Sequence, residues 1–364
     1  MKQKRVLVAM SGGVDSSVAA LLMKKKGYEV VGAFMKNWSE KKDKGVCRWK
    51  EERKIAMKIA ARLNIPLITL DFEKQYRKEV VQEMFNLYRK GITPNPDIDC
   101  NQKIKFPLLW EVAKKIKADF IVTGHHARIK KTKGSYKLLR GKDETKDQSY
   151  FLYRLNQKDL RHSLFPIGEY TKKHVRKIAE ENQFENYNKK GTVGICFIGK
   201  VNLKKFLQKK IKPKKGKILS PEGKTIGQHD GIYYYTIGQR IGPRFGIEIE
   251  KGKGKQLKRW YVAIKIPRTN TIIAAPEGHS SLYKKEIIIK NPHWISEIPS
   301  KSKISKVSTR IRQVGELLPS ILSYNKSKKQ FGVLLKKPIS GVSEGQAIVL
   351  YKGKKVLGGG IISF

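Results

Sequence analysis

The sequence has few cysteines and no long apolar run. Three cysteines among 364 residues are too few to staple a fold of this size, so the chain is expected to fold around hydrophobic cores in a reducing compartment, the cytosol. No apolar run approaches the roughly eighteen residues of a transmembrane helix, and the apolar stretch near the N-terminus is confined to residues 6–10. The composition therefore argues against secretion and against a membrane span.

Acidic residues are also scarce. The chain carries 31 Asp and Glu against 78 Lys and Arg, which is a formal net charge of +47. A field of this sign attracts polyanions, which makes RNA or DNA a leading partner. Many of the cations are lysines accompanied by Ile and Asn, so an AT-rich genome that favours lysine codons explains the excess equally well. Net charge leaves both explanations open.

The most informative local pattern is residues 11–17 (SGGVDSS), which join a strand-like run at 5–10 to a helical stretch at 18–26. Adjacent glycines can expose successive backbone N–H groups, serines add hydroxyl donors, and a helix N-terminus favours an anion. The pattern predicts a nucleotide-phosphate site. The positions after the second glycine lack the lysine of the common P-loop, which argues against kinase-like γ-phosphoryl transfer. The alternative is a tight turn without a ligand.

Apolar runs alternate with amphipathic segments in the first part of the chain. We expect strands at residues 28–35, 66–72 and 119–123, and helices at 50–63, 74–89 and 106–116. This alternation predicts an α/β fold with a parallel, doubly wound sheet. Ligands of such sheets bind beyond the carboxyl ends of the strands, so residues 11–17, Met35 and Gly124 are expected to converge on one crevice.

The second half of the chain has a different pattern. Residues 204–217 are rich in lysine and lack acidic residues, which is typical of a solvated linker that also contacts RNA phosphates. Beyond it, short alternating segments separated by Gly and Lys predict an all-β C-terminal third, with strands at 307–314, 330–336, 346–351 and 356–364. We expect domains at 1–203, 204–278 and 279–364.

Two cysteines lie in distinctive strings. Residues 93–101 (TPNPDIDCN) place Cys100 three residues after Asp97 in a loop that two prolines hold extended, and residues 191–199 (GTVGICFIG) place Cys196 between glycine-rich turns. Read alone, each cysteine is more often a small buried hydrophobe than a catalyst. Asp97 either handles a proton or caps a turn.

In combination these strings resemble one family. Residues 11–17 resemble the PP-loop of the ATP pyrophosphatases, and together with both cysteine strings they resemble the bacterial tRNA-specific 2-thiouridylases. Five more strings carry the resemblance over nearly the whole chain: 32–38 (GAFMKNW), 123–127 (TGHHA), 146–152 (KDQSYFL), 235–240 (YTIGQR) and 310–313 (RIRQ). The resemblance implies an N-terminal PP-loop domain like the adenine nucleotide alpha hydrolases, a small central tRNA-binding domain and a C-terminal β-barrel-like domain.

The resemblance also implies an activity, the ATP-dependent 2-thiolation of the wobble uridine in the tRNAs for Lys, Glu and Gln. ATP with Mg²⁺ adenylates the C2 carbonyl oxygen, and a persulfide on Cys196 then displaces AMP. Cys100 assists and forms a transient disulfide with Cys196, and Asp97 handles the proton. A cysteine desulfurase or a relay protein supplies the sulfur to a cytoplasmic monomer.

Site residues follow from the same resemblance, position by position. ATP is expected on Ala9, Met10, Ser11, Gly12, Gly13, Val14, Asp15 and Ser16, with Met35 and Gly124 beside the adenosine. Contacts with tRNA are expected from Asn95, Pro96, Asp97, His125, Lys146, Asp147, Gln148, Arg310, Ile311, Arg312 and Gln346. Asp15 is expected near the Mg²⁺, and the chain offers no metal-binding cluster of its own.

Two rival functions stay open at this point. A PP-loop synthetase that uses an amine nucleophile, such as argininosuccinate synthetase, needs no pair of cysteines. A basic RNA-binding protein with an ancestral nucleotide fold binds tRNA without turning over ATP. The third cysteine, Cys47, has neither a CxxC spacing nor a nearby His cluster, so we expect a structural role for it.

Overall fold

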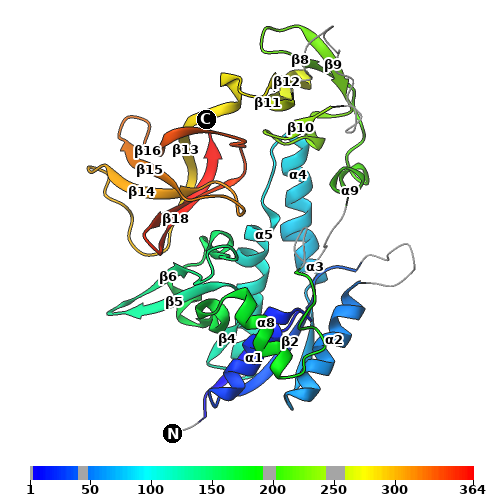
Figure 1. The fold of residues 1–364 in the computed structure, drawn as a ribbon, viewed down its shortest axis with the longest axis vertical. Coiled ribbons are helices and arrows are strands. Elements are labelled where there is room, and N and C mark those ends of the chain that lie inside the picture. The colour runs from blue at the N-terminus through cyan, green and yellow to red at the C-terminus, as the bar shows by residue number, and fades with distance from the viewer. Residues whose placement is uncertain (1–2, 40–47, 192–201, 243–258) are drawn as a thin grey trace.

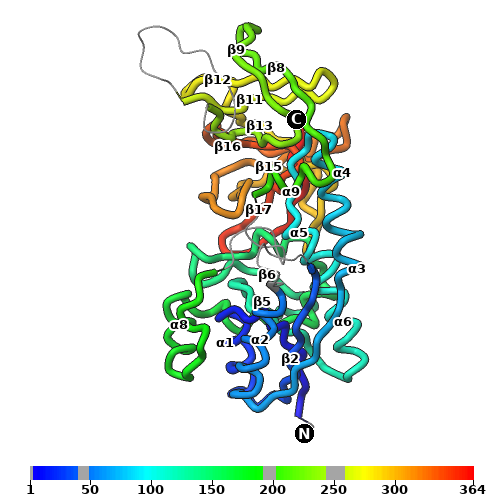
Figure 2. Tube along the Cα trace, turned by 90° about the vertical axis from the view of Figure 1, so that its right-hand side faces the viewer, coloured from blue at the N-terminus to red at the C-terminus, as the bar shows by residue number. Residues whose placement is uncertain are grey.

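Three structural units lie along the long axis of the molecule in the computed structural model, which describes residues 3–39, 48–191, 202–242 and 259–364 (Figure 1). The N-terminal unit is at one end, the middle unit is at the other, and a β-barrel lies against both (Figure 2). No helix in these described ranges is long and apolar enough to cross a membrane.

The N-terminal unit is built on a parallel sheet with strand order β3-β2-β1-β4-β7. Strand β1 lies at its centre, and its residues Val6, Leu7 and Val8 are fully buried, as expected of a parallel strand with both faces covered. Two hydrophobic clusters cover those faces. One packs α6 on the sheet, and the other packs α1, α2 and α8 on the opposite face. The sheet is therefore doubly wound, which confirms the expected fold class.

The expected elements of this unit match the structure within a few residues. The strands are β1 Arg5–Ala9, β2 Glu29–Lys36, β3 Leu67–Asp71, β4 Phe120–Val122 and β7 Ser163–Leu164. The helices are α1 Val14–Lys25, α2 Arg48–Arg62, α3 Glu73–Tyr76, η1 Arg77–Gln82, α4 Glu83–Arg89, α5 Pro96–Asp99, η2 Cys100–Lys105, α6 Phe106–Lys115, η3 Ser149–Leu152, α7 Gln157–Arg161, η4 Pro166–Glu169 and α8 Lys172–Glu181. The hairpin of β5 Ala127–Thr132 and β6 Ser135–Arg140 was not expected, because its lysines obscure the alternation of apolar residues.

The lysine-rich segment 204–217 is not a solvated linker throughout, so that part of the prediction is wrong, while contact of its lysines with RNA phosphates stays a prediction. It contains helix α9 Leu203–Gln208 and the start of strand β8. Phe206 and Leu207 are buried, and the ring of Phe206 stacks on that of Phe85 with centroids 5.5 Å apart. The apolar residues at 203, 206 and 207 have the spacing of a helix face, which the surrounding lysines masked.

The middle unit is a five-stranded sheet with strand order β10-β11-β12-β8-β9. Its strands are β8 Gly216–Leu219, β9 Thr225–His229, β10 Arg240–Ile241, β11 Trp260–Ile266 and β12 Thr271–Pro276, with 3-10 turns η5 Ile232–Tyr234, η7 Pro267–Thr269 and η8 Ser280–Leu282. Helix α4 extends from the N-terminal unit to this sheet (Figure 1), so the two units share one continuous helical segment.

The C-terminal unit is a closed barrel of six antiparallel strands. Its strands are β13 Tyr283–Trp294, β14 Ser305–Arg310, β15 Leu318–Asn325, β16 Gln330–Ser340, β17 Ala347–Lys352 and β18 Lys355–Ser363. Pairing of β13 with β18 closes the barrel, and this removes the exposed sheet edges. The strand expected at 307–314 ends at Arg310, so the residues that follow form a turn.

All three units meet at the segment around residues 91–95. Thr93 contacts Thr236 of the middle unit, with their hydroxyl oxygens 3.1 Å apart. Gln346 of the barrel donates hydrogen bonds of 2.9 Å to the carbonyl oxygens of Thr93 and Pro94. Gly345 packs so closely that a Cβ there would lie 2.1 Å from Ile92 Cγ2 and 2.9 Å from Thr93 O. The backbone of the barrel therefore supports this segment directly.

This contact predicts that Gly345→Ala is more damaging than Gly353→Ala. Both glycines have positive φ, +84° and +56°, so an alanine costs about 1–2 kcal/mol at either position. At Gly353 the new Cβ would meet open space among the described residues, whereas at Gly345 it collides with Ile92, which adds about 1–3 kcal/mol. Thermal unfolding of both variants measures the difference, and equal losses would contradict the packing argument.

Candidate active site

The loop of residues 11–17 lies where strand β1 enters helix α1. Its serines stabilise the loop through hydrogen bonds within the loop itself. The Ser16 and Ser17 hydroxyls both donate to Gly13 O, at 2.9 and 3.1 Å, and the backbone N–H of Ser11 donates to Ser16 Oγ at 3.1 Å. In this structure both hydroxyls contact the loop itself, and their expected role as donors to a phosphate stays a prediction. Among the described residues no side chain caps α1, so backbone N–H groups of its first turn remain for an anion.

Two glycines are required by close contacts of the backbone. Gly12 has φ +71°, and a Cβ there would lie 2.4 Å from Glu52 O. Gly124 follows β4, and a Cβ there would lie 2.7 Å from Ser16 N. Because β1 lies between β2 and β4, the loop after β1 meets Gly124 on one side and the end of β2, with Met35, on the other. The expected nucleotide residues therefore gather at the point where the strand order reverses.

Asp15 in this loop is held by two basic groups. Lys172 Nζ lies 2.6 Å from both carboxylate oxygens, and His126 Nε2 lies 3.3 Å from Oδ1. Burial acts to raise the pKa of Asp15, but the hydrogen bond from His126 and the charge of Lys172 outweigh it, so the pKa is lowered. Asp15 is therefore ionised at neutral pH. Sequence reasoning missed Lys172, because nothing at position 172 distinguishes it from the other lysines.

The segment that carries Asp97 and Cys100 is helical. It is not the extended loop that two prolines suggested, because helix α5 begins at Pro96 and continues into η2 at Cys100. Proline suits the first turn of a helix, where its missing N–H is not needed. Cys100 is three positions after Asp97, so the two share one face of this helical segment. Asp97 is half-buried and Cys100 is fully buried.

Asp99 lies beside Cys100 and was not expected as a site residue. Burial raises the pKa of Asp99, and the charges of Lys103 and Arg154 offset only part of this rise. Lys103 Nζ lies 3.5 Å from its carboxylate. Cys196 and Cys47 lie outside the described residues.

The residues expected to contact tRNA fall into two groups. Two of these side chains are exposed, those of Lys146 and Arg312. Five are half-buried: Asn95, Pro96, Asp97, Gln148 and Gln346. His125, Asp147, Arg310 and Ile311 are buried. His125 packs against Phe106 and Phe165, and burial lowers its pKa well below the usual value, so its imidazole is neutral at pH 7. The four buried side chains support the surface and do not form it in this structure.

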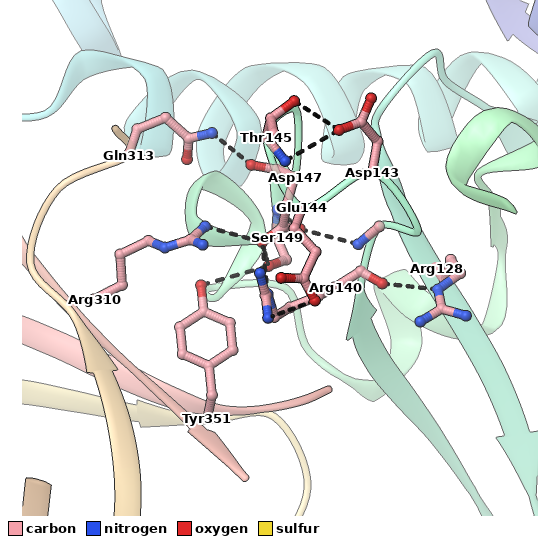
Figure 3. A network of polar contacts seen from close by, with 11 residues as sticks. Arg128, Arg140, Asp143, Glu144, Thr145, Asp147, Ser149, Arg310, Gln313 and Tyr351 are labelled. Atoms are coloured by element: carbon pink, nitrogen blue, oxygen red, sulfur yellow. Dashed lines mark hydrogen bonds and ion pairs between the residues drawn. The ribbon is translucent and has the colours of Figure 1, made fainter. Parts of the chain in front are cut away.

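Asp147 is the centre of a buried network between the N-terminal unit and the barrel (Figure 3). Its Oδ2 accepts from Arg310 at 2.9 Å, from Arg140 at 3.3 Å and from the Ser149 hydroxyl at 3.0 Å. Its Oδ1 accepts from the backbone N–H groups of Gly141 and Ser149 at 3.0 and 3.1 Å. Arg310 comes from β14 of the barrel, so this carboxylate joins the two units.

Removal of Asp147 should destabilise the protein strongly. Its side chain is fully buried, so Asp147→Ala leaves the buried guanidinium groups of Arg140 and Arg310 without this partner, at a cost of about 3–5 kcal/mol. The matched control is Glu144→Ala. Glu144 also pairs with Arg140, but its side chain is 64% exposed, so its loss costs about 0–1 kcal/mol. Urea unfolding followed by tryptophan fluorescence measures both, and similar losses would contradict the role of the buried carboxylate.

Comparison with known proteins places this site in a family. The model of a tRNA methyl transferase HUP domain matches residues 4–200, that of a tRNA methyl transferase PRC-barrel domain matches 204–276, and that of an aminomethyltransferase beta-barrel domain matches 284–362. The chain is 42% identical to the tRNA-specific 2-thiouridylase MnmA of Ruthia magnifica over 363 residues, covering 100% of this chain and 98% of that protein.

Other relatives show the same extent of similarity. MnmA 1 of Geobacillus kaustophilus is 42% identical over 364 residues, covering 100% of this chain and 96% of that protein. MnmA of Coxiella burnetii is 42% identical over 362 residues, covering 98% of both chains. Identity at this level along the full length establishes descent, fold and family. The chain therefore belongs to the tRNA-specific 2-thiouridylase family.

Proposed function

We propose that this chain is a tRNA-uridine 2-sulfurtransferase that uses ATP to convert a wobble uridine into 2-thiouridine. The observation that carries the proposal is the loop of residues 11–17, which presents an uncapped helix N-terminus at the reversal point of the sheet with Gly124 packed against it. Relatives named tRNA-specific 2-thiouridylases match the whole chain. We place the enzyme in the cytoplasm, where tRNA and ATP occur together.

The chemistry needs two steps because the C2 oxygen of uracil is a poor leaving group. In the first step this oxygen attacks the α-phosphorus of ATP and pyrophosphate leaves. In the second step a sulfur nucleophile adds to C2 and AMP leaves with the former carbonyl oxygen. A persulfide is well suited to this attack, since sulfur reactivity follows the anionic fraction and access to the carbon. The products are 2-thiouridine, AMP and pyrophosphate.

We assign Cys196 as the carrier of the persulfide and Cys100 as its partner. The terminal sulfur of the Cys196 persulfide either adds to C2 or leaves as sulfide. In both cases the Cys100 thiolate would attack Cys196 Sγ and break its bond to that terminal sulfur, which frees the thiolated base or sulfide and leaves a disulfide between the two cysteines. Cys100 is fully buried in the described structure, so this step requires a movement of the chain around it. We assign Asp97 as the group that takes the N3 proton of uridine.

The binding of the nucleotide and the tRNA is assigned to different parts of the fold. We assign Asp15 as the residue that would hold the Mg²⁺ accompanying ATP, because this ion commonly uses one or two carboxylates together with substrate phosphates; it would offset pyrophosphate charge there. Both carboxylate oxygens of Asp15 contact Lys172 in this structure, so binding of the ion would require Lys172 to move. For tRNA we assign direct contact to the exposed Lys146 and Arg312, and a positioning role to Asp147 and Arg310. Gln346 positions the segment at Thr93 and Pro94 through its two hydrogen bonds.

The partners and the oligomeric state follow from the same proposal. Sulfur must arrive as a persulfide, so a cysteine desulfurase or a sulfur-relay protein is the required donor. We also propose that the enzyme acts as a monomer. We propose the tRNAs for Lys, Glu and Gln as the substrates.

The cysteine assignment is tested by nucleoside mass spectrometry on a transcript that carries a wobble uridine. Wild type with ATP and a persulfide donor should form 2-thiouridine and release AMP and pyrophosphate. Cys196→Ser and Cys100→Ser should each reduce persulfide-dependent thiolation at least about 100-fold, because each removes a sulfur that takes part in covalent transfer. Cys47→Ser is the control and should thiolate like wild type.

Measurement of AMP and of thionucleoside in the same samples separates the alternatives. Release of AMP without entry of sulfur into the base would identify an adenylating enzyme of another kind, such as a synthetase with an amine nucleophile. Salt-sensitive tRNA binding without ATP turnover would identify a basic RNA-binding protein. Thiolation that survives both cysteine substitutions would contradict the assigned roles of Cys100 and Cys196.

A further inference from the structure

A cavity separate from the nucleotide loop lies between the β5–β6 hairpin and helix α7, and we call it the hairpin pocket. Its volume is about 690 Å³, which is within the range of sites for small ligands. Its lining contains three exposed cations, Lys131, Lys158 and Arg161, and no acidic residue. The hairpin projects from the N-terminal unit on the side of the molecule where the barrel lies (Figure 1). The pocket is therefore a cationic cavity that the proposed chemistry does not use.

The pocket and the nucleotide loop lie at opposite ends of the parallel sheet. His162, in the pocket wall, immediately precedes β7, which runs parallel to β4, whereas the nucleotide loop follows the carboxyl end of β1. Strand β6 begins at the pocket with Ser135 and ends at Arg140, which contacts Asp147. The six residues of this strand span about 20 Å. RNA that contacts the exposed Lys146, next to Asp147, covers this distance with about six nucleotides of a helical strand.

The cations of the pocket have no counter-ion among the described residues. No described carboxylate forms an ion pair with Lys131, Lys158 or Arg161. The pKa of Glu111 is lowered first by its hydrogen bond with Lys114, at 2.8 Å, and then by the charges of Lys114 and Lys158, so this carboxylate is already paired with Lys114. A positive field that is not neutralised from within the protein attracts an anionic ligand.

The wall of the pocket is held in place by hydrogen bonds and by ring stacking. The backbone of Tyr136 donates to Gln157 Oε1 at 2.8 Å and accepts from Gln157 Nε2 at 2.9 Å, and the same nitrogen donates to Ile295 O of the barrel at 2.7 Å. The ring of His162 stacks on that of Trp110 with centroids 3.9 Å apart. Burial and the charges of the two cations of α7 lower the pKa of His162, so its ring is neutral. The wall is therefore organised before a ligand binds.

The chemistry of the lining favours a nucleotide over a segment of protein. Protein interfaces have an apolar core, but no lining residue of the pocket is aliphatic. Cations beside aromatic rings suit the phosphates and bases of RNA. We propose that the hairpin pocket binds one nucleotide of the substrate tRNA, remote from the base that reacts, and holds its phosphate with Lys131, Lys158 and Arg161 beside the rings of Tyr136 and His162. The inference rests on the proposed function, because that function makes tRNA the substrate.

Diffuse attraction is the competing explanation. The chain carries a formal net charge of +47, so any exposed lysine helps to attract RNA from solution. Diffuse attraction depends on how many charges are removed, whereas a contact depends on where they are removed. A contact also involves particular phosphates of the tRNA. Variants that lose equal charge at different positions therefore separate the two explanations.

The test measures binding of tRNA to the full-length protein at several salt concentrations. Lys158→Gln/Arg161→Gln, the pocket variant, should raise the Kd for tRNA about 10-fold, the effect of losing charged hydrogen bonds. It should also lower the slope of log Kd against log salt by about 2. The matched control, Lys58→Gln/Lys177→Gln, removes the same charge from α2 and α8, at side chains that are 56% and 70% exposed. It should raise the Kd less than about threefold and keep the slope of wild type.

Steady-state kinetics and phosphate ethylation give two further readouts. The pocket variant should raise the KM for tRNA about 10-fold and change kcat less than about twofold, because the pocket is remote from the reacting base. Ethylation of a phosphate removes its charge. One or more ethylated phosphates away from the reacting nucleotide should block binding to wild type and to the control, and should have no effect on the pocket variant.

Three outcomes would overturn this inference and leave the proposed function intact. Equal losses in the pocket variant and the control, or the same interfering phosphates in both, would show that the attraction is diffuse. Unchanged tRNA binding with slower sulfur transfer from a donor protein would assign the pocket to a protein partner. A second calorimetric site for AMP in wild type that is absent from the pocket variant, with tRNA binding unchanged, would assign it to a free nucleotide.

Failure of the proposed function gives a different result. If wild type binds tRNA without thiolating it, the proposed function fails, and the binding and ethylation measurements still decide the role of the pocket. If wild type does not bind tRNA, the inference and the proposed function both fail.

Discussion

The buried carboxylate of Asp147 constrains how the barrel can sit on the N-terminal unit. A charge without water is costly unless it is paired and hydrogen-bonded, and here Arg310 of the barrel and Arg140 of the β5–β6 hairpin provide the paired charges. Backbone N–H groups of Gly141 and Ser149 complete the shell. The contact between Arg310 and Asp147 therefore constrains where the barrel lies on the N-terminal unit.

From this carboxylate a continuous set of contacts leads to the nucleotide loop. The residue after Asp147 is Gln148, whose side-chain oxygen accepts from the backbone N–H of His126 at 2.9 Å. The ring of His126 in turn contacts Asp15, and Asp15 contacts Lys172. On the opposite side Gln346 holds the backbone at Thr93. The barrel is therefore connected through hydrogen bonds to the nucleotide loop, and it also contacts the segment that leads to Asp97 and Cys100.

Local patterns predicted much of the N-terminal unit and misjudged segments whose structure depends on distant partners. The loop at 11–17 and the strands around it are encoded by neighbouring residues, through glycine conformations and buried apolar runs. Helix α9 was hidden because the lysines around Phe206 outnumber the apolar residues that pack on Phe85. The two prolines at 94 and 96 predict an extended loop, whereas Pro96 begins a helical turn, since proline suits both conformations and its surroundings decide.

The sequence by itself determined the chemistry-bearing strings, the doubly wound fold class and the all-β character of the last third, because each depends on residues close together in the chain. Only the tertiary structure decided which side chains meet. The pairing of Lys172 with Asp15 spans 157 positions and that of Arg310 with Asp147 spans 163. No local pattern records such contacts, because they arise when separate elements pack and must neutralise the charges that packing buries.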